Sequence, residues 1–353
     1  MSDTLIPEGT SLSPPETLRR LMTSYVVSQA LYVAAKLGIA DLLAEGPRSA
    51  DELASAASVH ARSLFRVLRL LTGVGVFARS GDREFTLNEL GECLRTGVPG
   101  SVRSAAMLFG EEPYRASGDL LHTVCTGQTA FEHVFGVSHY EYLASHPGPA
   151  ETFHHGICQL TGVVHESLLA AYDFSTAGTL VDVGGGQGLL IASILAAHPS
   201  VRGILFDTRS ALAEAERLML AERLAERCDI VQGDFFDSVP GRGDTYLLKS
   251  VIHNWNDDRA VRILRNCSRA MAPVSKLLLI ERLIADENGA SFFPQVNDVI
   301  MMIVAGGAER TETEYRALCA AADLCVTALM PTTSGFSILE CAPRLPAADS
   351  TAD

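Results

Sequence analysis

The stretch "VDVGGGQG" at residues 181–188 decides the fold, because it lies between an apolar run and a helical pattern. A strand, a glycine loop and a helix in this order predict a ligand-binding turn, since glycines let backbone N–H groups approach a ligand closely. The spacing argues against the dinucleotide fingerprint G-x-G-x-x-G, whose last position falls on Leu189 or Ile191. No GKS or GKT follows, so the loop is not a P-loop either.

Outward from this loop, short apolar runs alternate with helical patterns. The runs include "RGILF", "DIVQGD", "TYLLKSV" and "KLLLIERL", and the helical stretches include "DDRAVRILRNCSRAM". This alternation predicts a parallel, doubly wound α/β sheet. The last two runs, "CVTALMPT" and "FSILECAP", flank Ser334 and Gly335 and predict a closing antiparallel hairpin. We therefore expect one α/β domain over residues 176–345.

The loop matches the pattern D-x-G-x-G-x-G, which is typical of class I S-adenosylmethionine-dependent methyltransferases. The matching residues are Asp182, Gly184, Gly186 and Gly188. A carboxylate beside such a loop suits a ligand that carries an ammonium and a sulfonium, whereas it would repel a pyrophosphate. The pattern therefore favours S-adenosylmethionine over a dinucleotide.

Acidic residues also follow the next two predicted strands. Asp207 closes "GILFD", where doubly wound nucleotide-binding sheets place an acid that accepts hydrogen bonds from ribose hydroxyls. The segment "QGDFF" contains Gly233, Asp234 and Phe235, which we expect to form an acceptor for the adenine amino group and an apolar wall. Three acids at three successive strand ends predict one cofactor site.

The N-terminal half predicts helices. Helical spacing over 18–45 ends at Gly46 and Pro47, and Ser49 with Glu52 has the spacing of a capping box. A helix over 61–72 and a hairpin around Ser80-Gly81-Asp82 complete a winged-helix pattern. We expect a winged-helix-like dimerisation domain over 17–100 and a helical, substrate-lining region over 101–175. Disordered tails are expected at 1–16 and 346–353.

Composition limits the partners. The formal net charge of −14 argues against a nucleic-acid partner, because such binding needs Lys and Arg to neutralise phosphates. The eight cysteines are scattered without a CxxC pair or a zinc-ligand spacing, which indicates reduced thiols, no metal and a cytoplasmic location. No apolar run is long enough to span a membrane.

Several blocks resemble those of the plant-type small-molecule O-methyltransferases, a family that also includes bacterial enzymes of natural-product biosynthesis. The blocks are "VDVGGGQG", "GDFFDSVP", "LLKSVIHNWNDDRAVRILRNC", "LLIERL" and "GGAERTETEYRAL". The resemblance implies a Rossmann-like methyltransferase domain, an N-terminal dimerisation domain and a homodimer. It also implies methylation of a hydroxyl on a small aromatic substrate, which converts S-adenosylmethionine to S-adenosylhomocysteine.

The resemblance further implies roles for single residues. His253 would be the general base, Glu281 and Glu309 would flank and orient its imidazole, and Lys249 would line the cofactor site. A histidine titrates near neutrality, and a carboxylate on one ring nitrogen leaves the other free for a substrate proton. The residues expected to contact the acceptor are Phe153, Ile157, Asn254, Met301 and Met302.

Asn254 stands where this family usually has aspartate, and an amide stabilises an imidazolium less than a carboxylate would. This difference keeps a second hypothesis open, namely C- or N-methylation, or a methyl-free hydroxylation or rearrangement on the same scaffold. A third hypothesis is a DNA-binding regulator that senses S-adenosylmethionine, which the winged-helix pattern motivates and the acidic charge opposes.

Overall fold

The computed structural model describes residues 12–81, 83–161, 164–285 and 292–344. The chain divides into two units: the first extends to Leu121 and includes Ala130–Thr161, and the second comprises His122–Thr129 and the chain from Gly162. Helix α8, Leu120–Thr126, crosses this boundary. The region expected as one substrate-lining segment, 101–175, is therefore shared between the two units.

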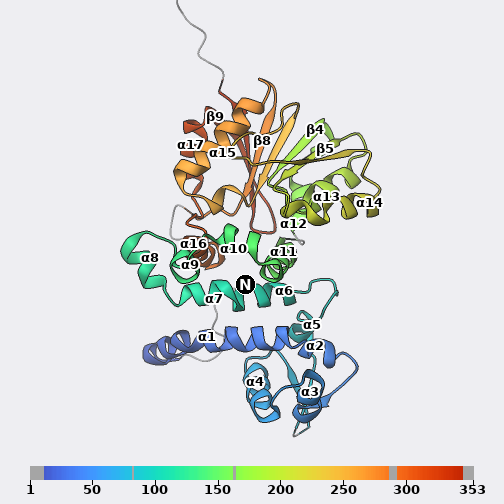
Figure 1. The fold of residues 1–353 in the computed structure, drawn as a ribbon, viewed down its shortest axis with the longest axis vertical. Helices are drawn as coiled ribbons and strands as arrows, with labels where there is room; N and C mark the ends of the chain where they lie inside the picture. The colour runs from blue at the N-terminus through green and yellow to red at the C-terminus, as the bar shows by residue number, and fades with distance from the viewer. Residues whose placement is uncertain (1–11, 82, 162–163, 286–291, 345–353) are drawn as a thin grey trace, which may run out of the picture. The chain divides into compact units, whose positions relative to one another are not determined.

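The first unit is mainly helical (Figure 1). Its helices are α1 Pro14–Lys36, α2 Ile39–Leu42, α3 Ala50–Ala57, α4 Ala61–Gly73, α5 Glu89–Glu92, α6 Arg103–Gly110, α7 Glu112–Ser117, α9 Ala130–Phe135, α10 His139–Ser145 and α11 Pro147–Thr161. Its strands are β1 Arg48–Ser49, β2 Ala78–Ser80 and β3 Glu84–Thr86, which form a small antiparallel sheet in the order β1-β3-β2.

The winged-helix pattern predicts the local structure of this unit correctly. Ser49 caps α3 and forms the capping box with Glu52. Helix α4 buries leucines at helical spacing in a core that it shares with α1 and α3. Strands β2 and β3 form the predicted hairpin, although Asp82 of its turn lies outside the described residues. Helix α1 begins at Pro14 behind Ser13, three residues before the expected start of the domain.

The second unit contains a seven-stranded sheet in the order β6-β5-β4-β7-β8-β10-β9. The strands are β4 Thr179–Val183, β5 Arg202–Asp207, β6 Cys228–Gln232, β7 Thr245–Lys249, β8 Lys276–Glu281, β9 Leu324–Pro331 and β10 Ser337–Pro343. Strand β10 runs antiparallel to both of its neighbours, and the pairs among β4–β8 are parallel. The predicted doubly wound sheet and closing hairpin are confirmed.

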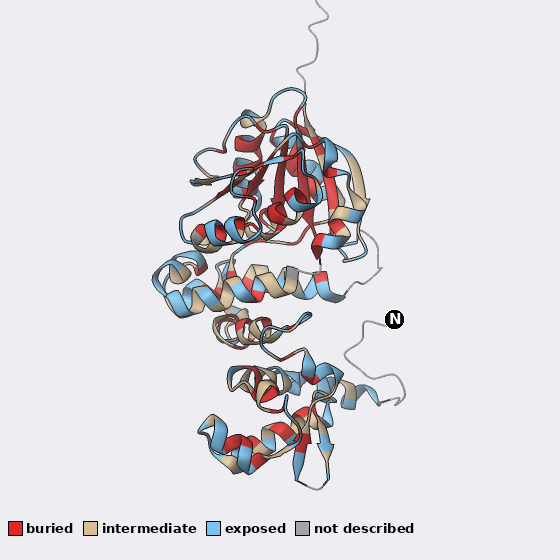
Figure 2. Cartoon of the chain, turned by 90° about the vertical axis from the view of Figure 1, so that its right-hand side faces the viewer, coloured by how far each residue is buried: buried red, intermediate tan, exposed pale blue. Residues whose placement is uncertain are grey.

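Helices cover both faces of this sheet (Figure 1). They are α12 Val164–Ala171, α13 Leu189–Ala197, α14 Ala215–Ala221, α15 Asp257–Ala270 and α17 Glu312–Ala321. The unit also contains α16 Phe292–Val304, which is not part of either core, and 3-10 turns at Phe174–Thr176, Ala211–Glu214 and Ile252–Asn254. Within β8, Leu278 faces the core built with α12–α14, whereas Leu277 and Leu279 face the core built with α15 and α17. The inner strands β4, β7 and β8 are buried on both sides (Figure 2), which explains their nearly continuous apolar sequences.

The order of the strands reverses between β4 and β7, because the chain adds β5 and β6 on one side of β4 and β7 and β8 on the other. Doubly wound sheets bind ligands at the carboxyl ends of the strands beside such a reversal. In the described part of the chain, no helix is long and apolar enough to cross a membrane.

Candidate active site

The glycine loop joins β4 to α13 at this reversal. Gly184 and Gly188 have positive φ angles of 72° and 84°, and a Cβ on Gly184 would lie 2.8 Å from the Val251 side chain. The Gly186 N–H donates a hydrogen bond to Asp207 Oδ2 at 2.8 Å. A Cβ on Gly186 would meet nothing within 4 Å, so the loop faces open space there. The loop is therefore packed against Val251 and bonded to Asp207, and it leaves open space beside Gly186 where a ligand could bind.

Asp182 lies beneath the loop and is 2% exposed. A Cβ on Gly185 of the loop would lie 2.6 Å from the carboxylate of Asp182. Burial raises the pKa of Asp182 to about 7, Lys249 opposes this rise, and Asp207 adds to it. Among the described residues, Oδ2 of Asp182 is buried without a hydrogen-bond partner. An orphaned carboxylate oxygen fits a cationic ligand such as the ammonium of S-adenosylmethionine.

The other two acids also lie at strand ends. Asp207 ends β5, and its Oδ1 accepts a hydrogen bond from Thr208 N–H at 2.6 Å. Gly233 donates its N–H to the Asp207 carbonyl at 3.0 Å, and Asp234 Oδ1 accepts from Phe236 N–H at 2.8 Å. Since β4, β5 and β6 are adjacent, the structure brings the three predicted acids to one edge of the sheet.

Two further predicted cofactor residues are in the same part of the unit. The side chain of Phe235 approaches the glycine loop, because a Cβ on Gly184 would lie 3.5 Å from its ring. Lys249 ends β7, the strand beside β4. The charge of Lys249 lowers the pKa of both Asp182 and His253, so its ammonium acts electrostatically on both sides of the site.

His253 lies on the 3-10 turn that follows β7, after Ser250 at φ 54°. Its Nδ1 is 2.6 Å from Glu309 Oε1, and the two side chains are 14% and 0% exposed. A carboxylate can only accept, so Nδ1 carries the hydrogen, and in the neutral imidazole Nε2 keeps its lone pair. Burial disfavours the imidazolium, but the charge of Glu281 and the bond to Glu309 outweigh burial and raise the pKa of His253.

Glu281, the other acid expected beside the imidazole, bonds to the backbone that leads into His253. Its Oε1 accepts hydrogen bonds from Val251 N–H at 3.2 Å and Ile252 N–H at 3.0 Å. It therefore fixes the backbone that leads into His253 and acts on the imidazole through its charge. Burial raises the pKa of Glu281 to about 7.

The expected acceptor residues are distributed over both units. Phe153 and Ile157 lie on α11 of the first unit, where the Phe153 ring is 5.2 Å from that of His139. Met301 and Met302 are partly buried on α16 of the second unit. Asn254 follows His253, and its Nδ2 donates to the Ser250 carbonyl at 3.0 Å. This amide therefore fixes the local turn.

The segment around Glu309 packs against the segment around His253. The residues that hold the two segments together were not among those predicted from the sequence. A Cβ on Gly307 would lie 2.0 Å from the His253 carbonyl oxygen, and Ala308 N–H donates to that oxygen at 2.9 Å. Arg310, 3% exposed, donates to the Trp255 carbonyl at 2.7 Å and to Asp257 Oδ1 at 2.8 Å. The glycine pair before Glu309 in "GGAERTETEYRAL" was the available sequence signal.

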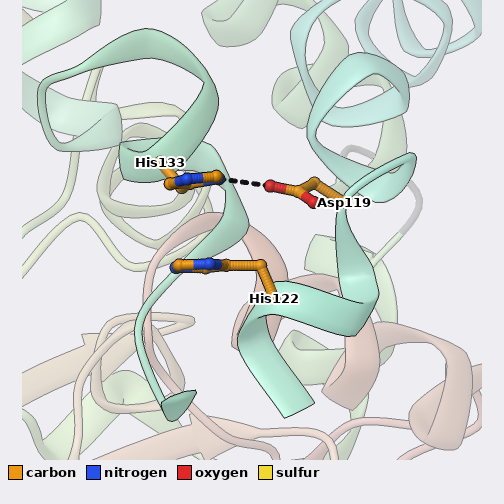
Figure 3. A group of neighbouring side chains, drawn as sticks. All are labelled: Asp119, His122 and His133. Carbon is orange, nitrogen blue, oxygen red and sulfur yellow. Dashed lines mark hydrogen bonds and ion pairs between the residues drawn. The ribbon is translucent and has the colours of Figure 1, made fainter. Parts of the chain in front are cut away.

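Another histidine–carboxylate pair lies in the first unit. His133 of α9 bonds through Nδ1 to Asp119 Oδ2 (Figure 3). Their side chains are 55% and 36% exposed, in contrast to the buried pair of His253 and Glu309. An exposed pair of this kind contributes little, so we assign it no part in the chemistry.

Two family models match the chain, and the boundary between them lies before α8, so it differs from the boundary between the two structural units. Residues 118–324 match the family model of the O-methyltransferase domain, and residues 19–97 match that of the O-methyltransferase dimerisation domain. The chain belongs to the O-methyltransferase family. The expected methyltransferase fold, the methyltransferase activity and S-adenosylmethionine as cofactor are thereby confirmed. The winged-helix unit of this O-methyltransferase corresponds to the dimerisation domain of the family.

The relatives of this O-methyltransferase match nearly its whole length. Phenazine O-methyltransferase PhzM of Lysobacter antibioticus is 43% identical over 92% of this chain and 95% of its own. The crystal structure of LaPhzM has a TM-score of 0.90 at 42% identity, covering 94% of this chain and 100% of that one. NcsB1 of neocarzinostatin biosynthesis, solved with S-adenosylmethionine and 2-hydroxy-5-methyl naphthoic acid, has a TM-score of 0.83 at 34% identity, covering 92% and 98%.

Proposed function

We propose that this O-methyltransferase methylates a hydroxyl group of a flat aromatic natural product, with His253 as the general base. The observation that carries the proposal is the buried pair of His253 Nδ1 and Glu309 Oε1 at 2.6 Å, which leaves Nε2 free to accept a proton. The polycyclic aromatic compounds named for PhzM and NcsB1 support the substrate class.

Bound S-adenosylmethionine supplies a methyl group on a positively charged sulfur. We assign its binding to the glycine loop, Asp182, Asp207, Asp234 and Lys249. The loop has space for a ligand, and the buried Oδ2 of Asp182 suits its ammonium. We assign the ribose hydroxyls to Asp207 because it ends β5, where doubly wound sheets place such an acid, and its carboxylate also accepts from the Gly186 N–H.

In the proposed mechanism, Nε2 of His253 accepts the proton of the acceptor hydroxyl as that oxygen gains its methyl group. Glu309 holds the imidazole by its Nδ1–H and stabilises the imidazolium that forms. General base catalysis of this kind contributes on the order of 10²–10⁴ in rate. Positioning of the hydroxyl supplies the remainder, so removal of the base should slow turnover without abolishing it.

The test is His253→Ala, assayed with saturating S-adenosylmethionine and a panel of hydroxylated phenazines and naphthoic acids. We expect kcat to fall by about 10²-fold or more, whereas calorimetry should show unchanged cofactor affinity. Wild-type turnover in the variant would refute the base assignment. Failure of the wild-type protein to methylate any aromatic hydroxyl in the panel would contradict the proposed substrate class.

A homodimer is the second part of the proposal. Helix α1 exposes apolar side chains at positions three and four residues apart, a spacing that places them on one face of a helix. These are Leu18, Leu21, Met22, Tyr25 and Val26, which are 43–66% exposed. The match of this region to a dimerisation domain supports a second copy of the chain as the partner that covers them.

A further inference from the structure

Helix α16 contacts Glu309 at two points. Asn297 Nδ2 donates a hydrogen bond to Glu309 Oε1 at 2.5 Å, and Asp298 Oδ1 accepts one from the Glu309 N–H at 2.9 Å. Oε1 of Glu309 therefore receives two donors, because His253 Nδ1 lies 2.6 Å from the same atom. Within the described ranges, the second oxygen, Oε2, is buried and has no hydrogen-bond partner.

We propose that Asn297 is a positioning residue for the general base, an inference that depends on the proposed role of His253. A carboxylate rotates easily about its last torsion, which has a broad, roughly two-fold profile. The amide of Asn297 holds Oε1 in the direction of His253, so that the imidazole keeps one orientation and one tautomer. Because the amide is neutral, it fixes Glu309 without cancelling the charge that stabilises the imidazolium.

Charged and titratable groups from several elements surround this pair, and all of them enter its pH dependence. Glu281 and Lys249 affect the pKa of His253, whereas Tyr315 and Arg282 have pKa values that respond to Glu309. The pKa of Asp298 is raised by burial and by neighbouring acids, and Arg310 opposes that rise. Of the two residues that hydrogen-bond to the Glu309 side chain among the described residues, Asn297 is the one that does not titrate, so introducing a titratable group at this position is informative.

Asn297→Ala removes the donor. We expect kcat to fall about tenfold while the KM for S-adenosylmethionine stays unchanged, since the amide of Asn297 donates to Glu309, which is not one of the residues assigned to the cofactor. The Nδ1–H proton resonance of His253, assigned by its absence from His253→Ala, should shift or broaden. Asn88→Ala is the matched control, because it loses an amide hydrogen bond to the Gly75 carbonyl in the first unit. The control should keep both kcat and the resonance.

Asn297→Asp tests the inference with a side chain of the same shape. The new carboxyl can donate to Glu309 only while it is protonated, and it repels Glu309 once it ionises. The ratio of variant to wild-type kcat should therefore be close to one at acidic pH and fall about tenfold as the pH rises. A ratio independent of pH, with the resonance unmoved in Asn297→Ala, would overturn the inference. If His253→Ala is fully active, the base assignment itself is wrong.

Discussion

Two buried glutamates act on His253 in different ways. Glu309 bonds directly to the imidazole, whereas Glu281 accepts from the backbone N–H groups of Val251 and Ile252. Both are negative neighbours that favour the imidazolium, and their effect exceeds the opposing effect of burial. The sequence blocks indicated which acids belong to the site. They could not indicate this division of tasks, because it depends on side-chain directions in the folded protein.

The raised pKa of His253 predicts the pH dependence of turnover. A general base must be neutral to accept a proton, so activity should increase as the pH rises through the pKa of His253. Since this pKa lies above the ordinary value of about 6.5, the midpoint of the ascending limb of kcat should also lie above about 6.5. The measurement is kcat against pH with both substrates saturating.

Glu281→Gln provides the comparison for this profile. The charge of Glu281 is the largest contribution that raises the pKa of His253, so its removal should move the ascending limb to lower pH. The variant keeps an oxygen that can accept from the backbone of residues 251 and 252. A limb that moves to higher pH, or does not move, would contradict the account of this glutamate.

At the scale of the elements, sequence patterns predicted those features that short stretches determine. Ser49 and Glu52 marked the start of α3, and the glycines at 184, 186 and 188 marked the turn from β4 into α13. The contacts of α16 with Glu309 could not be predicted, because twelve residues along the chain separate Asn297 from its partner and no local pattern records that they meet. Tertiary packing brings them together.

The exposed apolar face of α1 predicts the effect of charge on assembly. In Met22→Glu/Tyr25→Glu, two carboxylates would have to lose their hydration in a buried interface, so the variant should be monomeric. Analytical ultracentrifugation should show a dimer for the wild-type protein and for Thr23→Glu, whose position points away from this face. A dimeric double variant would show that α1 is not the interface.

At the scale of the whole molecule, the residues assigned to the chemistry all belong to the second unit, whereas two residues expected to contact the acceptor belong to α11 of the first. The sequence indicated both groups by their resemblance to one family. The placement of the unit boundary between Thr161 and Gly162, before α12, was not foreseen, because the helical pattern continues through that region.

This division predicts separable effects on the two substrates. Phe153→Ala and Ile157→Ala should each raise the KM for the aromatic acceptor about tenfold, the effect of a lost apolar contact. Cofactor affinity measured by calorimetry should stay the same, because the glycine loop and its acids lie in the other unit. Glu151→Ala, an exposed change on the same helix, is the control. Weaker cofactor binding in Phe153→Ala with an unchanged acceptor KM would contradict the assignment.

Gly307 restricts how this enzyme can diverge. Any side chain at Gly307 would collide with the carbonyl oxygen of His253. A substitution of this glycine therefore requires the backbone of the turn that carries the base to move. Duplicated genes could acquire new acceptors through changes at Phe153 and Ile157 of α11, whereas loss of this glycine should leave a protein that keeps the fold and binds the methyl donor but turns over slowly.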